Sequence, residues 1–227
     1  MPTKITLIDR THTAASLAAE LRQYNLVVLI RRFLYDQLYP EDESSTATSH
    51  NDRQLPEFYG RVWVYKSAVS TFRAPSDLSG LGGMRRERIR AVPSWGNGPA
   101  RYDCVFVSTD SVAEGFRGLD VARVRLFFAI KFRDKTYPCA LIHWMIRVGD
   151  EPDEDTGMWM VRPDSNADGS PHIAVVHLDC ILRAAHLIGI CGHEHLPKGL
   201  SFHNSLDAFR AFYVNKFVDH HAFEIAS

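Results

Sequence analysis

Residues 121–133, VARVRLFFAIKFR, are the stretch that decides the fold class, because their side chains alternate in character. A period of two places successive side chains on opposite faces of a β-strand. One face is wholly apolar, and its members are Ala122, Val124, Leu126, Phe128, Ile130 and Phe132. The other face carries Phe127 and the charged residues Arg123, Arg125, Lys131 and Arg133. We predict a strand whose apolar face belongs to the core and whose other face is partly charged.

Turn residues and strand-like runs continue this pattern along the chain. Arg133-Asp134-Lys135 predicts a hairpin turn, and Tyr137–Val148 is the expected returning strand. Four further runs are rich in β-branched and aromatic residues: Arg61–Phe72, Asp103–Thr109, Met158–Arg162 and Ile173–Leu178. Short strands at this spacing are typical of a small curled antiparallel sheet or barrel-like core.

Three segments are predicted to be helical, two of them from apolar residues at helical spacing. The first is Thr11–Tyr39, with Thr11 or Thr13 as its cap and Asn25 as a candidate break between two helices. The second is Met84–Val92, which we predict to be a short basic helix. The third is Ser205–Phe217, an amphipathic helix with Asn204 or Ser205 as its cap. A further segment, Asp179–Ile188, is predicted to be helical or irregular.

The predicted organisation is an α+β fold in three parts. Residues 1–40 form an N-terminal helical segment. Residues 41–55 are polar and without periodicity, so they are expected to form a mobile linker. Residues 56–227 form a strand-rich domain that ends in a C-terminal helix.

The composition is that of a globular protein in a reducing compartment. The chain has 227 residues, of which 45% are apolar, an ordinary share for a globular domain. No apolar run reaches the ~18 residues of a membrane span, and the N-terminus lacks the apolar core of a secretory signal. The four cysteines are widely spaced, which favours buried thiols over a disulfide framework. We therefore expect an intracellular protein with no membrane partner.

Positive charge is concentrated in the middle of the chain. The net charge is −1, yet residues 61–133 hold 13 Lys and Arg against 6 Asp and Glu, an excess of +7. Guanidinium groups bind phosphates through paired hydrogen bonds, and aromatic rings stack on bases. The candidate nucleic-acid-binding residues are Arg85, Arg86, Arg88 and Arg90, with Arg123 and Arg125 as helpers. The aromatic residues near them in sequence are Trp63, Trp95 and Tyr102.

Charge alone leaves a second interpretation open. The same arginines could form ion pairs within the protein, and the acidic turn Asp150–Asp155 has the right charge for this. The chain would then be a protein-interaction or assembly module that does not bind nucleic acid.

The histidines suggest two metal sites, and neither motif is complete. Cys191-x-His193-x-His195 offers one closely spaced ligand group, whereas structural zinc sites pair two such groups. His186, then Asn204 or Asn215, then His220 loosely follow the order of a His-Asn-His nuclease. No phosphate-binding Gly-x-x-x-x-Gly-Lys loop and no Gly-x-Ser-x-Gly motif occurs. We expect no catalytic residue, metal or cofactor, and keep the metal-dependent nuclease as an alternative.

Several short motifs occur together along the chain, including GMRRERIR at residues 83–90, RYDCVFV at 101–107 and GDEPDEDTGMW at 149–159. Others lie at residues 29–37, 74–80, 121–124, 137–141, 177–179, 183–187, 212–216 and 219–224. This set resembles the C-terminal, non-catalytic region of Plavaka-type transposases, which are found in fungal CACTA-like elements.

The resemblance implies an accessory role. In that family the cut-and-paste chemistry belongs to an upstream ribonuclease-H-like domain, which is absent here, so transposase activity is not implied. The strand pattern is similar to the small barrel-like modules that end other CACTA-type transposases and usually bind DNA, chromatin or protein. We therefore predict a transposase-derived domain, nuclear rather than cytoplasmic, that binds DNA or chromatin and the catalytic part of a transposase. The chain would be a stand-alone gene derived from an element or a truncated remnant of one.

Overall fold

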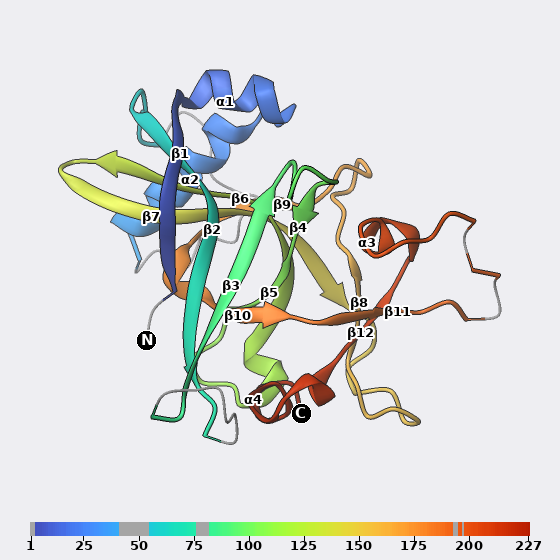
Figure 1. The fold of residues 1–227 in the computed structure, drawn as a ribbon. Helices are drawn as coiled ribbons and strands as arrows, with labels where there is room; N and C mark the ends of the chain where they lie inside the picture. The colour runs from blue at the N-terminus through green and yellow to red at the C-terminus, as the bar shows by residue number, and fades with distance from the viewer. Residues whose placement is uncertain (1–2, 41–54, 76–81, 193–194, 197) are drawn as a thin grey trace.

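The computed structural model describes residues 3–40, 55–75, 82–192, 195–196 and 198–227. The predicted hairpin stands in the middle of the strand order, and its turn lies at the left of Figure 1. β6 (Leu119–Phe132) and β7 (Lys135–Arg147) pair antiparallel over most of their length. Arg133 and Asp134 form the turn between them, with φ angles of 47° and 63°. Two consecutive residues in the left-handed region match the twist of the flanking strands, so this two-residue turn sets the register.

A bulge in β6 corrects the prediction of a single apolar face. The register with β7 shifts between Val124 and Leu126, which leaves Arg125 as an extra residue. One inserted residue exchanges the two faces of a strand. Ala122 and Val124 consequently lie in one buried cluster with Phe127. The residues expected on their face lie in another cluster: Leu126, Phe128 and Ile130, with Phe132 partly buried at its edge. Both faces of β6 are therefore core.

The other predicted strands are present, and the sheet is larger than predicted. The confirmed strands are β2 (Arg61–Arg73), β5 (Cys104–Ser108), β8 (Met160–Pro163) and β9 (Ile173–His177). The strands that the sequence did not reveal are β1 (Lys4–Thr13), β3 (Met84–Val92), β4 (Arg101–Tyr102), β10 (Ile181–Ala185), β11 (Leu187–Gly189) and β12 (Phe212–Val214). Together they form one 12-stranded antiparallel sheet in the described part of the chain.

The order of this sheet is β11-β12-β8-β7-β6-β2-β3-β4, with β1 on β2, β5 on β6, β9 on β7 and β10 on β5. Two branches leave β6, one through β2 to β3 and one through β5 to β10, and they curl towards each other (Figure 1). The backbone N–H of Ala184 in β10 donates to Glu87 Oε2 in β3 at 3.1 Å. The curl encloses a buried cluster that includes Ala68, Ile89, Val105, Val124, Phe127 and Ile142. The predicted curled antiparallel sheet is thus confirmed as a half-barrel.

The predicted basic helix Met84–Val92 is wrong, because this segment is strand β3. It pairs antiparallel with β2 from Ser67 to Arg73, and Ile89 is buried inside the curl. Helix propensity is a weak preference that backbone pairing and burial outweigh. For the same reason Asp179–Ile188, expected to be helical or irregular, continues from the short turn η3 (Leu178–Cys180) into β10 and β11.

The predicted C-terminal helix Ser205–Phe217 is also corrected. The observed helix, α3, covers Ser205–Ala208, and the chain then extends into β12 between β8 and β11. Phe212 and Val214 are buried there against the sheet, which is why the helical spacing does not produce a longer helix. The chain ends in the turn η4 (Lys216–Val218) and the helix α4 (His220–Ile225).

The N-terminal segment begins as a strand and continues as two helices. β1 extends through Thr13, so the helix predicted from Thr11 begins later, at α1 (Ala14–Leu21). Thr13 is its cap, and Thr13 Oγ1 accepts a hydrogen bond from the N–H of Ser16 at 3.1 Å. The expected break lies at residues 22–25, and α2 (Leu26–Leu38) follows Asn25. The helices pack on the hairpin in a cluster that includes Leu17, Ile30, Leu34, Phe128 and Ile130.

Most of the predicted linker, residues 41–55, lies outside the described residues. Its last residue, Leu55, is buried. Arg31 of α2 donates to the carbonyl oxygens of Leu55 and Pro56, each at 3.0 Å. Among the described helices, none combines the length and apolar character needed to cross a membrane.

Candidate nucleic-acid interface

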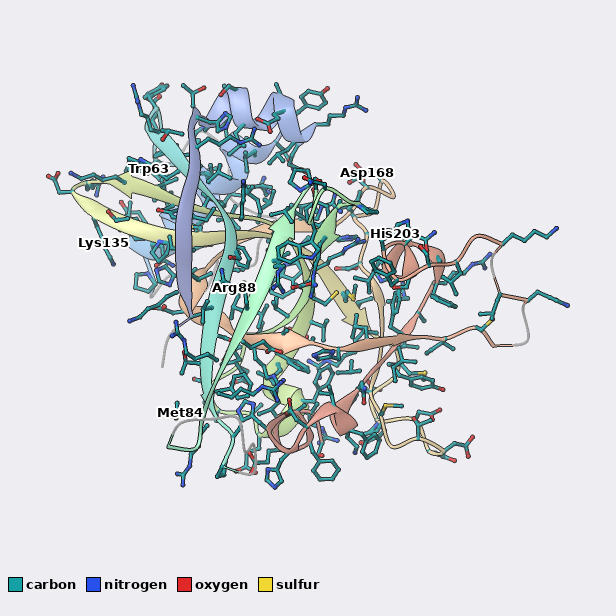
Figure 2. The ribbon with its side chains drawn as sticks, in the orientation of Figure 1. Trp63, Met84, Arg88, Lys135, Asp168 and His203 are labelled. Atoms are coloured by element: carbon teal, nitrogen blue, oxygen red, sulfur yellow. The ribbon has the colours of Figure 1, made fainter. Side chains whose placement is uncertain are left out.

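Strand β3 divides the predicted basic cluster between two faces. On an extended strand alternate residues share a face, so Arg86, Arg88 and Arg90 lie together. Arg86 and Arg88 are exposed and Arg90 is half-buried. Figure 2 shows Arg88 near the middle of β3, beside β2. The opposite face carries residues that are buried or partly buried: Arg85, Glu87 and Ile89.

Trp95 lies beside the end of this arginine row. It belongs to the turn at residues 93–100, in which the Trp95 N–H donates to the Pro99 carbonyl at 3.0 Å. The Cζ atom of Arg90 lies 4.2 Å from the centre of the Trp95 ring, and that of Arg101 lies 5.9 Å from it. Trp95 nevertheless keeps 48% of its surface exposed. An exposed aromatic ring between guanidinium groups can stack on a flat ligand that also carries negative charge.

The guanidinium groups of Arg90 and Arg101 both lie near the Trp95 ring, so positive charge is concentrated there. Burial lowers the pKa of Arg90, and the charge of Arg101 lowers this pKa further. Asp103 offsets part of the charge, because its carboxylate accepts from the backbone N–H of Arg90 and from Arg101 Nε, both at 2.8 Å. Within the described residues, Arg90 Nε is buried without a hydrogen-bond partner. An anion placed here would relieve the repulsion between the arginines.

A second aromatic ring, Tyr102, lies between the two arginines predicted from β6. The Cζ atom of Arg125 is 5.1 Å from the centre of the Tyr102 ring, and that of Arg123 is 5.9 Å from it. Arg125 is exposed because it is the extra residue of the β6 bulge. The bulge therefore presents the Arg125 side chain to solvent beside β4.

Arg88 Nη1 donates to the Ser67 hydroxyl at 3.1 Å, whereas Arg123 and Arg85 each pair with a carboxylate of the protein. Arg123 is only 9% exposed and donates to both carboxylate oxygens of Asp207, with Nη2 at 3.1 Å from Oδ2. Arg85 Nη1 lies 3.6 Å from Asp219 Oδ2. The alternative of internal pairing thus describes these two arginines, although their partners are not in the acidic turn Asp150–Asp155. That turn pairs with Arg117 instead, through Glu151 at 2.8 Å.

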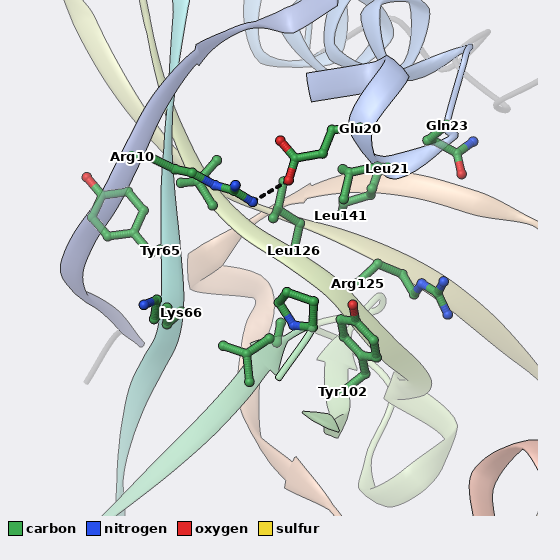
Figure 3. Close-up of a pocket in the computed structure, with 14 residues that line it drawn as sticks. Arg10, Glu20, Leu21, Gln23, Tyr65, Lys66, Tyr102, Arg125, Leu126 and Leu141 are labelled. Carbon is green, nitrogen blue, oxygen red and sulfur yellow. Dashed lines mark hydrogen bonds and ion pairs between the residues drawn. The ribbon is translucent and has the colours of Figure 1, made fainter. Parts of the chain in front are cut away.

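We refer to Arg86, Arg88, Arg90, Trp95, Arg101, Tyr102 and Arg125 as the arginine–aromatic surface. Three hollows open along it. The strand hollow, of about 390 Å³, is lined by Lys66, Ser67, Arg88, Arg90, Val92 and Trp95. The loop hollow, of about 590 Å³, is lined by Trp95, Arg101, Tyr102, Arg123, Phe202 and His203. The helix hollow, of about 230 Å³, is lined by Arg10, Glu20, Tyr65, Lys66, Tyr102 and Arg125, above apolar residues such as Leu126 (Figure 3).

Sequence reasoning found part of this surface. Trp95 and Tyr102 were expected as stacking residues and line the hollows. Trp63 was also expected, but it pairs with Ala129 of β6 and lines none of the three hollows. Phe202, which is 90% exposed, was missed because it is distant in sequence and belongs to no basic stretch. Lys66 was missed because no other basic residue lies near it in the sequence: Arg61 and Arg73, at the two ends of β2, are its nearest basic neighbours.

The predicted metal and nuclease residues make separate local contacts. His186 Nε2 lies 3.8 Å from Glu87 Oε1, and His220 Nδ1 lies 3.3 Å from Glu224 Oε1. Asn204 and Asn215 accept from backbone N–H groups of nearby residues, at 2.8 Å and 3.0 Å respectively. His193 of the Cys191-x-His193-x-His195 motif lies outside the described residues. The described part of the chain contains no group of three or more His, Cys, Asp or Glu placed to hold a metal ion.

Comparisons with known proteins do not place the chain in a family: no family model, no curated protein and no solved structure matches it.

Proposed function

We propose that this chain binds nucleic acid through its phosphate backbone, with Arg86, Arg88, Arg90 and Arg125 as the contacting residues. The observation that carries the proposal is the row of three guanidinium groups on one face of β3, which ends at the exposed ring of Trp95. Arginine binds phosphate oxygens in a bidentate manner, and several such groups in line can follow a charged backbone. Contacts to phosphates position a protein without reading sequence, so base specificity is not implied.

We propose four of the six arginines predicted from the sequence as the contacting residues, and the pairing of the other two supports this choice. Arg123 is held by both carboxylate oxygens of Asp207, and breaking this pair to bind phosphate would leave that carboxylate without its partner. Arg85 lies on the opposite face of β3 from Arg86, Arg88 and Arg90, 3.6 Å from Asp219. We propose that these two arginines stabilise the fold rather than contact the ligand.

The biological setting in the proposal follows from the resemblance. We propose a transposase-derived accessory domain that acts in the nucleus on DNA or chromatin, beside the catalytic part of a transposase. The motifs at residues 83–90 and 101–107 include Arg86, Arg88, Arg90, Arg101 and Tyr102 of the arginine–aromatic surface, and this overlap supports the setting.

A second candidate function is protein interaction or assembly without nucleic acid. Phe217 and Phe223 are both largely exposed near the C-terminus, with ring centres 6.0 Å apart. Lys216 Nζ lies 5.6 Å and 5.2 Å from these two rings. Exposed apolar groups that gather in one place favour contact with another protein.

A salt titration tests the proposal. Fluorescence anisotropy of a labelled oligonucleotide should give an affinity that falls linearly with salt on log–log axes, because phosphate contacts release counterions. Four contacts predict a slope of about −3 for single strands and about −3.6 for duplex. Arg86→Ala with Arg88→Ala should reduce the magnitude of the slope by about 1.4 to 1.8 and leave the melting temperature nearly unchanged.

The matched control is Arg117→Ala with Arg133→Ala, which removes the same charge from outside the arginine–aromatic surface. This control should retain the slope of the unmodified protein. If the unmodified protein binds neither DNA nor RNA at low salt, the nucleic-acid function is wrong and the protein-interaction function replaces it.

A further inference from the structure

We infer that the preferred ligand is single-stranded nucleic acid, with unpaired bases entering the hollows on either side of Trp95 and Tyr102. This inference rests on the proposed function and adds the class of nucleic acid. The arrangement of the three hollows supports it, whereas the row of arginines on β3 supports the proposed function.

Each of the two aromatic rings lines two neighbouring hollows. Trp95 lines both the strand hollow and the loop hollow. Tyr102 lines both the loop hollow and the helix hollow. A planar group in any of these hollows therefore lies beside at least one aromatic ring, and base–aromatic stacking is largely independent of base identity.

Each hollow also has cationic side chains on its wall. Arg88 and Arg90 line the strand hollow, Arg101 lines the loop hollow, and Arg125 lines the helix hollow. Figure 3 shows Arg125 beside Tyr102 among the residues that line the helix hollow. A ring and a cation in each hollow match one nucleotide unit, a flat base joined to a phosphate.

The shape of the site disfavours a double helix. The bases of a duplex are stacked on one another and present only their edges, so their faces cannot meet Trp95 or Tyr102. A duplex is usually read by a protruding helix or ribbon, whereas the hollows here are concave. Their volumes are about 230, 390 and 590 Å³, whereas sites for whole drug-sized ligands span about 300–1,000 Å³.

The test compares labelled oligothymidylate, oligouridylate and a self-complementary duplex of equal length, about 12 nucleotides, on the unmodified protein. Single strands should bind at least about 10-fold more tightly than duplex at the same salt concentration. Trp95→Leu should weaken single-strand binding roughly 10-fold or more, and Tyr102→Leu should act in the same direction. The aromatic variants Trp95→Phe and Tyr102→Phe should retain most of the affinity. The two single strands separate a DNA ligand from an RNA ligand.

Tryptophan fluorescence supplies a second measurement that does not depend on affinity. The chain has four tryptophans, and stacking of a base on Trp95 should quench the fluorescence of the unmodified protein. Trp95→Phe should bind single strands but lose this quenching. If duplex binds as tightly as single strands and Trp95→Leu binds normally, the inference is wrong while the proposed function stands. If the unmodified protein binds none of the three oligonucleotides, both the inference and the proposed function are wrong.

Discussion

At the scale of single residues, Arg183 shows how the fold stabilises a buried charge. Its side chain is fully buried and donates to both carboxylate oxygens of Asp219 at 2.7 Å. Glu87 Oε2 lies 3.6 Å from Arg183 Nε, and the guanidinium lies 4.2 Å from the centre of the Phe72 ring. These contacts link β10 with β2, β3 and the start of α4. Arg183 is thus a structural residue rather than part of the arginine–aromatic surface.

The first residue-scale prediction removes the main partner of this charge. Asp219→Ala should lower the free energy of unfolding by about 3 kcal/mol, because it leaves a buried guanidinium without its bidentate carboxylate. The loss should lie at the lower end of the usual range because Glu87 remains nearby. Urea denaturation measures it. The matched control is Asp179→Ala, an exposed carboxylate 3.5 Å from His177, which should cost less than about 1 kcal/mol. Equal losses in the two variants would show that the Arg183 pair is not buried in solution.

The pH dependence of stability tests the same pair. Burial alone would raise the pKa of Asp219, but hydrogen bonds from Arg183 and from the N–H of Ala222, with the charge of Arg183, lower it from 3.8 to about 2. A carboxyl group whose pKa is lower in the folded state than in the unfolded state stabilises the folded protein. This stabilisation is fully present above the unfolded pKa and is lost as the pH falls through the folded pKa. Stability should therefore fall between about pH 4 and pH 2. In Asp219→Asn this part of the decline should be absent, as measured by denaturation at a series of pH values.

At the scale of elements, the bulge in β6 determines both the core and the surface. It carries Leu126, Phe128 and Ile130 to the face covered by α1 and α2, and leaves Ala122 and Val124 inside the curl. The same extra residue, Arg125, becomes exposed beside Tyr102. The alternation correctly predicted that all these residues lie in a strand. It could not predict the bulge, because a bulge is defined by how a strand pairs with its neighbour and not by the strand's own period of two.

The element-scale prediction concerns burial under the helices. Phe128→Ala should lower the free energy of unfolding by about 3–5 kcal/mol, because Phe128 is fully buried and truncation leaves a cavity. Phe132→Ala, a partly buried residue of the same strand, is the control and should cost clearly less. Chemical denaturation measures both values. A loss below about 1 kcal/mol for Phe128→Ala would mean that the register or burial of β6 is wrong.

At the scale of the whole molecule, the N-terminal segment and the sheet share one buried cluster. Leu17, Ile30 and Leu34 of the helices lie in the same cluster as Phe128 and Ile130 of β6. β1 also pairs with β2 along most of its length, so residues 4–38 contact the sheet through both a strand and two helices. The core is therefore continuous across the boundary predicted between residues 1–40 and residues 56–227.

The whole-molecule prediction follows from this shared core. Helices and sheet should unfold in one cooperative transition. Circular dichroism at 222 nm follows the helices, whereas tryptophan fluorescence follows the sheet and its loops, because none of the four tryptophans lies in a described helix. The two thermal curves should coincide. An earlier transition in circular dichroism alone would indicate that α1 and α2 unfold separately.

The sequence by itself determined the central hairpin, the curled antiparallel character of the sheet and the break between the N-terminal helices. Each of these depends on neighbours in the chain: the alternation of residues 121–133, the turn at Arg133 and Asp134, and the polar residues around Asn25. It also identified the basic stretch and two of the aromatic residues near it. Local patterns sufficed because strand period, turn conformation and charge density are properties of consecutive residues.

Only the tertiary structure decided that residues 84–92 are a strand and which arginines of this strand share one face. Met, Arg and Glu favour helix locally, but pairing with β2 satisfies the backbone and buries Ile89. The same pairing directs Arg86, Arg88 and Arg90 to one face and Arg85 towards Asp219. Asp207 is 84 residues away from its partner Arg123 in sequence, and Asp219 and Phe202 also reach the site from a distant part of the chain. Their positions depend on the curl of the whole sheet, because such long-range contacts form only once the core is closed.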